Sequence, residues 1–478
     1  MPPLAARIER LATLSRGSTR QHAAEVRAGQ WLTPEASTAD QRRRLAALLA
    51  HASRHVPYYR EVFSSQGLAT ASAEALAVRF THLPLLDKAT LRARFDDLQS
   101  DDLQERTWRY DSTGGSTGEP VRLINDSTYL DWQRAVGLVA AAEILCRPLG
   151  EKRLHIWGSV DDLLTGKETL RARLGQWLRN EIWLNSFRLT PELMSSYVDI
   201  MNRSRPEHII AYVESAVEIA RFVERNGLTV HSPKTVATAA GCLQPHMRDL
   251  LTRVFRAEVF QSYGSREVSG MAFECNRHAG MHVPVQTVFL EVLRDDGTPA
   301  EPGETGRIVV TSLVNYALPL IRYEIGDLGV WADAPCDCGR VWPLLREITG
   351  RVSDTFVTAD GTLVAGQYFN YAFHLQDWIE KFQVIQESTR HVRARIVQRK
   401  DLPDIEAMRA AGISEITRRV QLAMGEECAV SFEFVDHIEP SASGKYRFTI
   451  TKVHDTGDPT ASSAAASFRE SAAAGDCV

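Results

Sequence analysis

The chain lacks an apolar run long enough to cross a membrane. Its longest apolar stretches, such as "VGLVAAAEIL" at residues 136–145, are about half as long as the roughly 20 residues that a membrane-spanning helix requires. The N-terminal stretch "MPPLAARIERLATLSRG" carries charges through its middle and has no apolar segment of the kind found in secretory signals. These absences predict a cytoplasmic protein that does not contact a membrane.

An excess of basic charge is also missing. The chain has 55 Lys and Arg residues against 60 Asp and Glu residues, which gives a net charge of −5. Proteins that bind nucleic acids usually concentrate positive charge on one face, so a nucleic-acid partner is not expected. Hydrophobic residues at 44% and charged residues at 24% are typical of a soluble globular chain, and 478 residues suffice for about three domains.

Cysteine is scarce, with seven residues spread along the chain. An odd count in a chain without a secretory signal argues against a disulfide framework. Cys336 and Cys338 stand too close together for an ordinary disulfide, so this pair indicates metal binding instead.

Strands and helices alternate in the middle of the chain. Between residues 206 and 263, the strands "EHIIAY", "KTVATA" and "AEVFQ" are separated by two helical segments, one closed by Gly227 and one opened by Pro245. This βαβαβ order predicts a parallel sheet covered by helices. Ligands of such sheets bind at the carboxyl ends of the strands, so we expect function in the loop "SYGSREVSG" that follows the third strand.

The flanking regions predict the rest of an α/β fold. Residues 1–100 are mostly helical in pattern, residues 285–332 are rich in strands, and a smaller α+β unit follows Gly350. We therefore expect a large N-terminal domain over 1–350, with parallel-sheet subdomains and a β-rich subdomain, and a small C-terminal domain over 351–455. The Ala- and Ser-rich residues 456–478 are predicted to be a disordered tail.

The segment "YDSTGGSTGEPVRL" at 110–123 has a composition suited to phosphate but lacks the lysine of a Walker loop. Glu119 stands in the lysine position, and a strand rather than a helix is predicted to follow. Backbone N–H groups and hydroxyls could still surround an anion. The candidate residues are Ser112, Thr113, Gly114, Gly115, Ser116, Thr117 and Gly118. A flexible exposed hairpin remains the alternative.

Several further motifs follow this segment in a fixed order. They are "YGSRE" (263–267), "GETGRIVV" (303–310), "LIRYEIGD" (320–327), "ITGRVSD" (348–354) and "PSASGK" (440–445). Together they resemble the adenylate-forming superfamily of acyl-CoA ligases, peptide-synthetase adenylation domains and luciferases. The segments "VPYYREVF", "YALPLIRY" and "PCDCGR" resemble its phenylacetate-coenzyme A ligase branch, and the C-terminal segments "FQVIQE" and "SGKYRFTI" resemble capsule-biosynthesis-type members. The resemblance covers about residues 50–455.

The resemblance implies a site for ATP. It implies that the Gly/Ser/Thr loop closes over the β- and γ-phosphates, and that the small mobile domain supplies the essential lysine, Lys445. Tyr263, Gly264 and Gly241 would contact adenine, Glu267 would ligate Mg²⁺, and Asp327 would bind the ribose hydroxyls. Arg351 would bind ribose or α-phosphate oxygens, and Asp354 would be the hinge of the small domain. Ile325 stands where threonine is usual in the family, and Cys242 stands where glutamate is usual.

A second constellation contains thiols and imidazoles. Three thiols and one imidazole suit tetrahedral Zn²⁺, and nothing in the pattern requires an open coordination position, so we expect a structural zinc site. Its predicted ligands are Cys275, His282, Cys336 and Cys338. His278 is the alternative imidazole, and buried free thiols with surface histidines are the alternative to a metal site.

These features predict an AMP-forming acid ligase. We expect ATP-dependent activation of a small carboxylic acid, favoured to be aryl or arylalkyl, to an acyl-adenylate, followed by transfer to coenzyme A. Trp157, Tyr212 and Tyr263 could line an aromatic pocket, although core packing is the alternative. Transfer to an amine or a carrier protein, and a non-catalytic zinc-stabilised binding protein, are the alternative functions. A homodimer remains open.

Overall fold

The computed structural model describes the greater part of the chain. The described residues are 17–112, 121–157, 170–184, 191–241, 243–351, 355–360, 363–365, 369, 372–373, 376, 378–399, 405–438 and 449–453. They fall into two compact units, which are described separately. The first comprises Met1–Thr113, Val121–Ile325 and Gly329–Ile348, and the second comprises Gly114–Pro120, Gly326–Leu328 and Thr349–Val478. The predicted domain boundaries stay a prediction, and the predicted tail lies outside the described residues.

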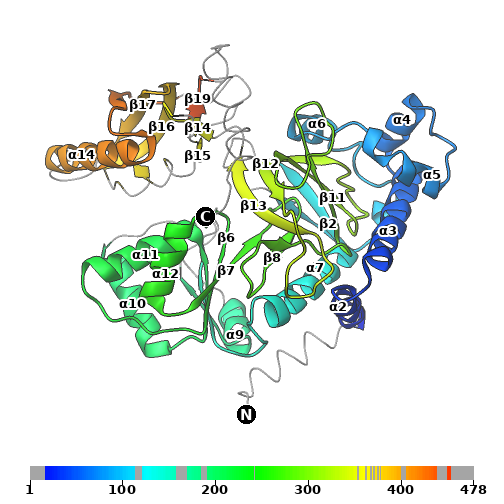
Figure 1. Cartoon of the computed structure of the whole chain (residues 1–478), viewed down its shortest axis with the longest axis horizontal. Coiled ribbons are helices and arrows are strands. Elements are labelled where there is room, and N and C mark those ends of the chain that lie inside the picture. Colours follow the sequence, from blue (N-terminus) through cyan, green and yellow to red (C-terminus); the bar gives the residue numbers. More distant parts are fainter. Residues whose placement is uncertain are drawn as a thin grey trace. The chain divides into compact units, whose positions relative to one another are not determined.

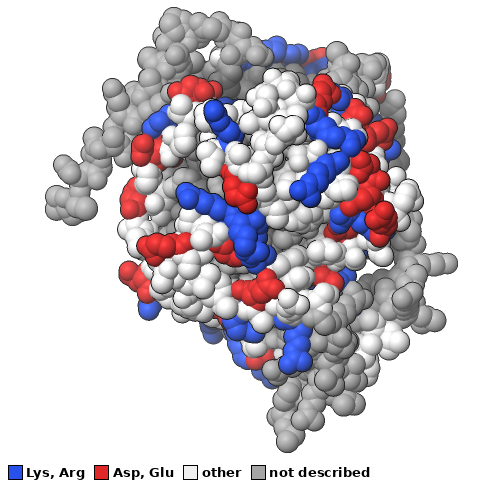
Figure 2. Space-filling view, turned by 90° about the vertical axis from the view of Figure 1, so that its right-hand side faces the viewer, with Lys and Arg blue, Asp and Glu red and all other residues white. Residues whose placement is uncertain are grey.

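The first unit begins with the expected helices. They are α2 (Gly17–Gly29), α3 (Pro34–His55), α4 (Pro57–Ser65), α5 (Ala73–Val78) and α6 (Lys88–Ala93), with short 3₁₀ turns at Phe80–His82 and Leu103–Glu105. The sequence dictates the start of α3, because the Thr33 hydroxyl accepts a hydrogen bond from the Ala36 N–H and Pro34 occupies the first turn. Figure 2 shows basic and acidic side chains interleaved over the face that carries α3 to α5.

A β-hairpin brackets the Gly/Ser/Thr segment. Strand β1 (Trp108–Ser112) pairs antiparallel with β2 (Arg122–Asp126), with Ser112 opposite Arg122. This confirms that a strand follows the segment, as predicted, while residues 113–120 lie outside the described residues. Asp126 then caps α7 (Ser127–Val139) by accepting a hydrogen bond from the Tyr129 N–H at 2.7 Å, and a π turn over Ala140–Ile144 follows.

The centre of the first unit is an eleven-stranded sheet of order β10-β11-β12-β13-β9-β8-β7-β6-β5-β3-β4. Its parallel part consists of β3 (Arg153–Ile156), β4 (Glu181–Leu184), β5 (His208–Tyr212), β6 (Thr235–Ala239) and β7 (Glu258–Tyr263). Helices α10 (Pro191–Ser204), α11 (Val213–Arg225) and α12 (Pro245–Phe255) pack together beside these strands (Figure 1), and α9 (Leu170–Leu178) precedes β4. The predicted βαβαβ unit is thus confirmed.

The sheet continues with the predicted strand-rich region. Its strands are β8 (Ala272–Glu274), β9 (Met281–His282), β10 (Val288–Leu293), β11 (Thr305–Ser312), β12 (Tyr323–Trp331) and β13 (Leu344–Arg351). Strands β7, β8, β9 and β13 pair antiparallel in succession. One sheet therefore joins the parallel and the antiparallel regions, and the predicted α/β fold class is confirmed.

The second unit is the smaller α+β body expected from the sequence. Its four-stranded sheet has the order β18-β17-β16-β19, formed by β16 (Ile379–Ser388), β17 (His391–Gln398), β18 (Ala429–Phe434) and β19 (Thr449–Thr451). Helix α14 (Ile405–Met424) contributes Ile416 and Val420 to its buried core. A short hairpin of β14 (Thr355–Val357) and β15 (Leu363–Ala365) completes it. Among the described helices, none is both long and apolar enough to cross a membrane.

Candidate functional site

Two of the predicted nucleotide-binding residues lie at the carboxyl ends of neighbouring parallel strands. Tyr263 ends β7 and Gly241 follows β6, and these two strands pair in parallel from Thr235 opposite Glu258 onward. The side-chain amide of Gln261 donates a hydrogen bond of 3.2 Å to the Gly241 carbonyl, which ties the loop after β6 to β7. Gly241 and Tyr263 therefore share the edge at which open parallel sheets bind ligands.

The loop after Tyr263 is a tight turn with no room for a side chain at Gly264. A Cβ atom there would lie 2.9 Å from the backbone nitrogen of Gly270. The Ser265 N–H donates to the Val268 carbonyl at 2.9 Å, and the Val268 N–H donates to the Ser265 hydroxyl at 3.1 Å. These bonds fix the direction in which Glu267 leaves the turn.

Glu267 is a buried carboxylate, only 6% exposed. The Tyr323 hydroxyl, at the start of β12, donates to it at 3.3 Å. An ionised carboxylate provides hard oxygen ligands of the kind that Mg²⁺ prefers, so this side chain fits the predicted metal role.

Asp327 lies on the same strand as Tyr323. The end of its motif is part of β12, with Gly326 in a left-handed conformation (φ +86°) and Asp327 half-buried. Ile325, which replaces the threonine usual in the family, is 8% exposed and belongs to the hydrophobic core. The replacement is therefore accommodated by packing and leaves Asp327 on its strand.

One charged contact in this region was not predicted from the sequence. Arg266 lies 3.6 Å from the Asp111 carboxylate, measured from its terminal nitrogen to Oδ1. Asp111 is on β1, directly before Ser112 and the Gly/Ser/Thr loop. The only feature of the sequence that pointed to this contact was the position of Arg266 within the "YGSRE" motif.

Two aromatic side chains meet at the carboxyl ends of β3 and β5. The rings of Trp157 and Tyr212 have centroids 4.2 Å apart and are inclined by 42°. The Trp157 N–H donates to the Leu184 carbonyl, which holds this residue beside the end of β4. Both side chains are partly buried, so they form an apolar surface at the ligand-binding edge.

The four predicted zinc ligands come together in the structure. The ligand atoms of Cys275, His282, Cys336 and Cys338 all lie within 4.8 Å of one another. Cys275 follows β8, His282 ends β9, and the two other cysteines lie in the loop between β12 and β13. The cluster thus joins two loops that are about 60 residues apart in sequence.

The spacing of these atoms fits a tetrahedral ion. The Cys275 and Cys336 sulfurs are 3.7 Å apart, and the Cys338 sulfur is 3.3 Å from His282 Nε2. Ideal Zn–S and Zn–N bonds would place two sulfurs about 3.8 Å apart and a sulfur and a nitrogen about 3.5 Å apart. Each sulfur also accepts a hydrogen bond from the backbone N–H two residues later, which favours the thiolate.

Burial explains the electrostatics of this cluster. It raises the pKa of the Cys275 thiol to about 12 and lowers the pKa of His282 to about 4. A dication would offset the cost of three buried thiolates, and the neutral imidazole is the form that binds a metal. His278 does not join the cluster, because its Nδ1 lies 3.1 Å from the Glu274 carboxylate. The structure therefore selects His282 over His278 as the candidate ligand.

The chain is similar in sequence to known proteins. The model of the CapK C-terminal domain matches residues 356–452. Protein CapK of Staphylococcus aureus is 22% identical over 424 residues, covering 86% of this chain and 89% of that protein. The chain is therefore similar to CapK over most of its length, and its C-terminal part matches the CapK C-terminal domain.

The chain is also similar to enzymes named as coenzyme A ligases. The phenylacetate-coenzyme A ligase of Thermus thermophilus is 24% identical over 357 residues, covering 72% of this chain and 77% of that protein. A 2-hydroxyisobutyryl-CoA ligase, solved in the postadenylation state, has a similar fold with a TM-score of 0.61 at 19% identity. That similarity covers 93% of this chain and 94% of the ligase. The predictions of the family and of an AMP-forming acid ligase are thereby confirmed.

Some of the predicted site residues lie outside the described residues. They are Thr113, Gly114, Gly115, Ser116, Thr117, Gly118, Cys242, Asp354 and Lys445. For two others only the backbone is described: Ser112 ends β1 and Arg351 ends β13. Their roles stay predictions. The five cysteines in the described part of the chain form no disulfide, as expected.

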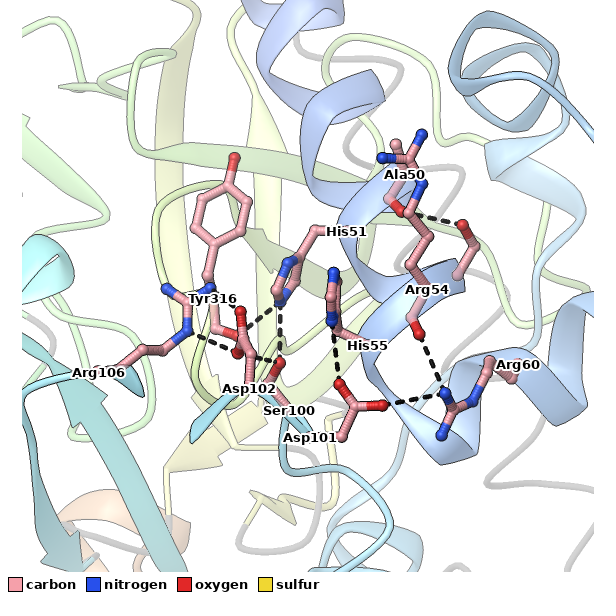
Figure 3. A network of polar contacts seen from close by, with 11 residues as sticks. Ala50, His51, Arg54, His55, Arg60, Ser100, Asp101, Asp102, Arg106 and Tyr316 are labelled. Carbon is pink, nitrogen blue, oxygen red and sulfur yellow. Dashed lines mark hydrogen bonds and ion pairs between the residues drawn. The ribbon is translucent and has the colours of Figure 1, made fainter. Parts of the chain in front are cut away.

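A network of polar contacts around His51 was not predicted from the sequence (Figure 3). His51 and His55 lie one turn apart on α3, and His51 Nε2 is 3.0 Å from the Tyr316 carbonyl and 3.1 Å from the Ser100 hydroxyl. These histidines lie near Asp102, so the three resemble a metal site in composition. Asp102, however, accepts hydrogen bonds from two nitrogens of Arg106 at 2.8 and 2.6 Å.

The same Arg106 reaches the hairpin. Another of its nitrogens donates to Asp126, the residue that ends β2 and caps α7. With Asp102 already engaged by the guanidinium, the network is better explained as a support for the hairpin than as a metal site.

Proposed function

We propose that this protein activates a carboxylic acid with Mg-ATP and transfers the acyl group to coenzyme A. The acid's carboxylate attacks the α-phosphate, pyrophosphate leaves, and an acyl-adenylate forms; the coenzyme A thiol then displaces AMP. The observation that carries the proposal is the Glu267 carboxylate, which is buried in the turn after β7 and oriented by the Tyr323 hydroxyl. The relatives named phenylacetate-coenzyme A ligases support the same reaction class.

The nucleotide residues position ATP rather than react with it. Tyr263 provides an aromatic face for adenine, and Gly264 and Gly241 permit close approach of the backbone. Asp327 accepts hydrogen bonds from ribose, and Glu267 would hold Mg²⁺, which when bound would neutralise phosphate charge. Positioning and charge neutralisation account for most of the catalysis expected in such a reaction.

The small domain supplies the remaining charge in this proposal. Lys445 contacts the reacting carboxylate and the α-phosphate, Arg351 binds ribose or α-phosphate oxygens, and Asp354 is the hinge about which the domain turns between the two half-reactions. These three assignments rest on the motifs "PSASGK" and "ITGRVSD" at their positions in the family pattern.

The acid is proposed to be aryl or arylalkyl. The Trp157–Tyr212 pair offers a flat apolar surface at the carboxyl ends of β3 and β5, where the acid would approach the α-phosphate. The second candidate acceptor is an amine or a carrier protein, because the residues described here carry no sharp coenzyme A motif.

We also propose a structural Zn²⁺ held by Cys275, His282, Cys336 and Cys338. The tetrahedral spacing of their ligand atoms and the N–H groups directed at the sulfurs support this assignment. The ion would tie the loop after β8 to the loop after β12, and it would take no part in the reaction.

Acid-dependent pyrophosphate exchange tests the adenylation. The purified protein is incubated with Mg-ATP, labelled pyrophosphate and a panel of aryl, arylalkyl and aliphatic acids. Exchange that requires an aryl or arylalkyl acid supports the proposal, and AMP release stimulated by coenzyme A identifies the acceptor. Absence of exchange with every acid would instead favour the non-catalytic, zinc-stabilised protein.

A further inference from the structure

We infer that a pocket at the amino ends of the parallel strands binds a small molecule that carries phosphate groups. The pocket has a volume of about 630 Å³. Its lining residues are Lys152, Asn180, Arg203, Ser204, Arg205, Glu207, His231, Ser232 and Lys234. The volume lies within the range of small-molecule sites in proteins, which is about 300–1,000 Å³. The inference does not rest on the proposed function, because the proposed nucleotide site lies at the carboxyl ends of these strands.

The topology of the sheet brings the lining residues together. Lys152 directly precedes β3, Asn180 precedes β4, Glu207 precedes β5 and Lys234 precedes β6. These four strands are parallel and adjacent in the order β6-β5-β3-β4, so their first residues lie at one edge of the sheet. All the lining residues belong to the first compact unit and to the described part of the chain.

The composition of the lining favours an anion. Four of the lining residues are Lys or Arg, a single one is acidic, and none is hydrophobic. Such a lining does not suit the aryl acid proposed as substrate, because apolar ligands are held by apolar side chains. The chain as a whole has a net charge of −5, so the positive charge of this pocket is a local concentration that attracts anions.

Two of the cations, Arg203 and Arg205, are not engaged elsewhere. Within the described part of the chain, neither guanidinium forms an ion pair or a side-chain hydrogen bond, and both residues are exposed. The planar fork of a guanidinium matches the oxygens of phosphate. A phosphate group has three acceptor oxygens and about two negative charges, so it can engage more cations at once than a carboxylate can.

The backbone at Arg205 does not require an arginine side chain. Arg205 follows the end of α10 with φ +49°, and its N–H donates to the Met201 carbonyl at 2.9 Å. Glycine adopts this left-handed conformation without the steric cost that a Cβ atom brings. The guanidinium is therefore free to bind a ligand, and Arg205→Gly should remove it without disturbing the turn.

The two lysines are held in place at the rim of the pocket. The Lys152 ammonium donates to the Ser204 carbonyl at 2.7 Å, at the end of α10, and the Lys234 ammonium donates to the Glu151 carboxylate at 2.5 Å. Glu151 is anchored in turn by the fully buried His208, whose Nε2 lies 2.7 Å from its other oxygen. Each ammonium has three donors, so both retain N–H groups for a ligand.

Calorimetry with pyrophosphate, ribose 5-phosphate and citrate tests the inference. It is run at about 0.15 M salt, which screens exposed charges beyond about 8 Å. We expect a phosphate probe to bind, and Arg203→Gln and Arg205→Gly each to weaken that binding by roughly tenfold, because a charged hydrogen bond is lost. Tighter binding of pyrophosphate would identify an inorganic ligand, and tighter binding of ribose 5-phosphate would identify a phosphate ester.

Two further variants separate the pocket from general surface charge. Glu207→Gln should strengthen binding, because it removes the one negative charge of the lining and can still accept the hydrogen bond from the Lys152 N–H. Arg256→Gln is the matched control, since Arg256 is also exposed and follows a helix, α12, with φ +50°, but does not line the pocket. It should leave binding and thermal stability unchanged.

Hydrogen exchange shows where the phosphate binds. Protection of residues 201–207 and 231–235 by pyrophosphate supports the inference, whereas protection confined to the loop after β7, at 264–270, would overturn it. The inference also fails if no phosphate probe binds, if citrate binds equally well, or if Arg256→Gln weakens binding as much as Arg205→Gly. These outcomes leave the proposed function untouched, because acid-dependent pyrophosphate exchange measures it separately.

Discussion

The Tyr323 hydroxyl donates a hydrogen bond to the Glu267 carboxylate across 56 residues of sequence. It connects the start of β12, the strand that also carries Asp327, to the turn after β7. Both residues are buried, so the carboxylate is held in one orientation before any ligand arrives. Two motifs that are separate in sequence thereby come into contact.

Tyr323→Phe should impair the use of Mg²⁺ while preserving the fold. The ring stays in the core, but Glu267 loses the donor that orients it, and the metal concentration for half-maximal adenylation should rise roughly fivefold to tenfold. The assay is pyrophosphate exchange over a Mg²⁺ titration. Tyr59→Phe is the control: Tyr59 is equally buried and its hydroxyl bonds to Pro319, so it should lower stability without changing the metal dependence. Equal metal dependence in both variants would contradict the role given to Tyr323.

Lys445→Ala should separate the two half-reactions. We expect acyl-adenylate formation to slow by roughly two orders of magnitude or more, because an aligned charge at the α-phosphate is lost. Thioester formation from chemically supplied acyl-adenylate should continue, since the lysine is proposed to have turned away by then. Both rates are measured in the same preparation of the variant. Equal loss in both half-reactions would point to misfolding or to another role for this residue.

Metal analysis should give about one zinc per chain, as a closed four-ligand site implies. Cys336→Ser and His282→Ala should lower both the zinc content and the melting temperature, because binding of the ion contributes to folding. Cys146→Ser and His278→Ala are the matched controls, since Cys146 is an exposed thiol and His278 faces Glu274. They should retain the metal. Zinc-free protein of full stability would refute the site, and zinc loss in His278→Ala would show that the wrong histidine was chosen.

Stability should fall as the pH drops below about 6.5, and His51 should account for part of the fall. Burial lowers the pKa of His51 from its usual 6.5, although the Tyr316 carbonyl acts in the opposite direction. The unfolded chain therefore binds this proton at a higher pH than the folded one, so the free energy of unfolding decreases below pH 6.5 and is constant above it with respect to this group.

His51→Gln isolates this contribution. The glutamine amide can still donate to the Tyr316 carbonyl but does not titrate, so urea unfolding at pH 5 to 7.5 should show a smaller pH dependence than in the native protein. The comparison is needed because burial lowers the pKa of other histidines too, namely His22, His155, His208 and His282. An identical pH dependence in the variant would exclude His51 as a contributor.

The sequence by itself determined the local elements and the resemblance to the adenylate-forming superfamily. Alternation of short apolar strands with helices between residues 206 and 263 predicted the parallel sheet, because hydrophobic period and turn residues are local properties. The spacing of Cys336 and Cys338 similarly predicted a metal site from chemistry alone. The site residues of the adenylate-forming pattern were found because each lies in a short contiguous motif.

Only the tertiary structure decided which distant side chains meet. The choice of His282 over His278, the bond from Tyr323 to Glu267 and the approach of Arg266 to Asp111 depend on strand order and register, which no local pattern encodes. The network around His51 escaped the sequence for the same reason. Its members come from three separate segments, and a hydrogen bond between residues 49 or 265 positions apart leaves no periodic trace in the sequence.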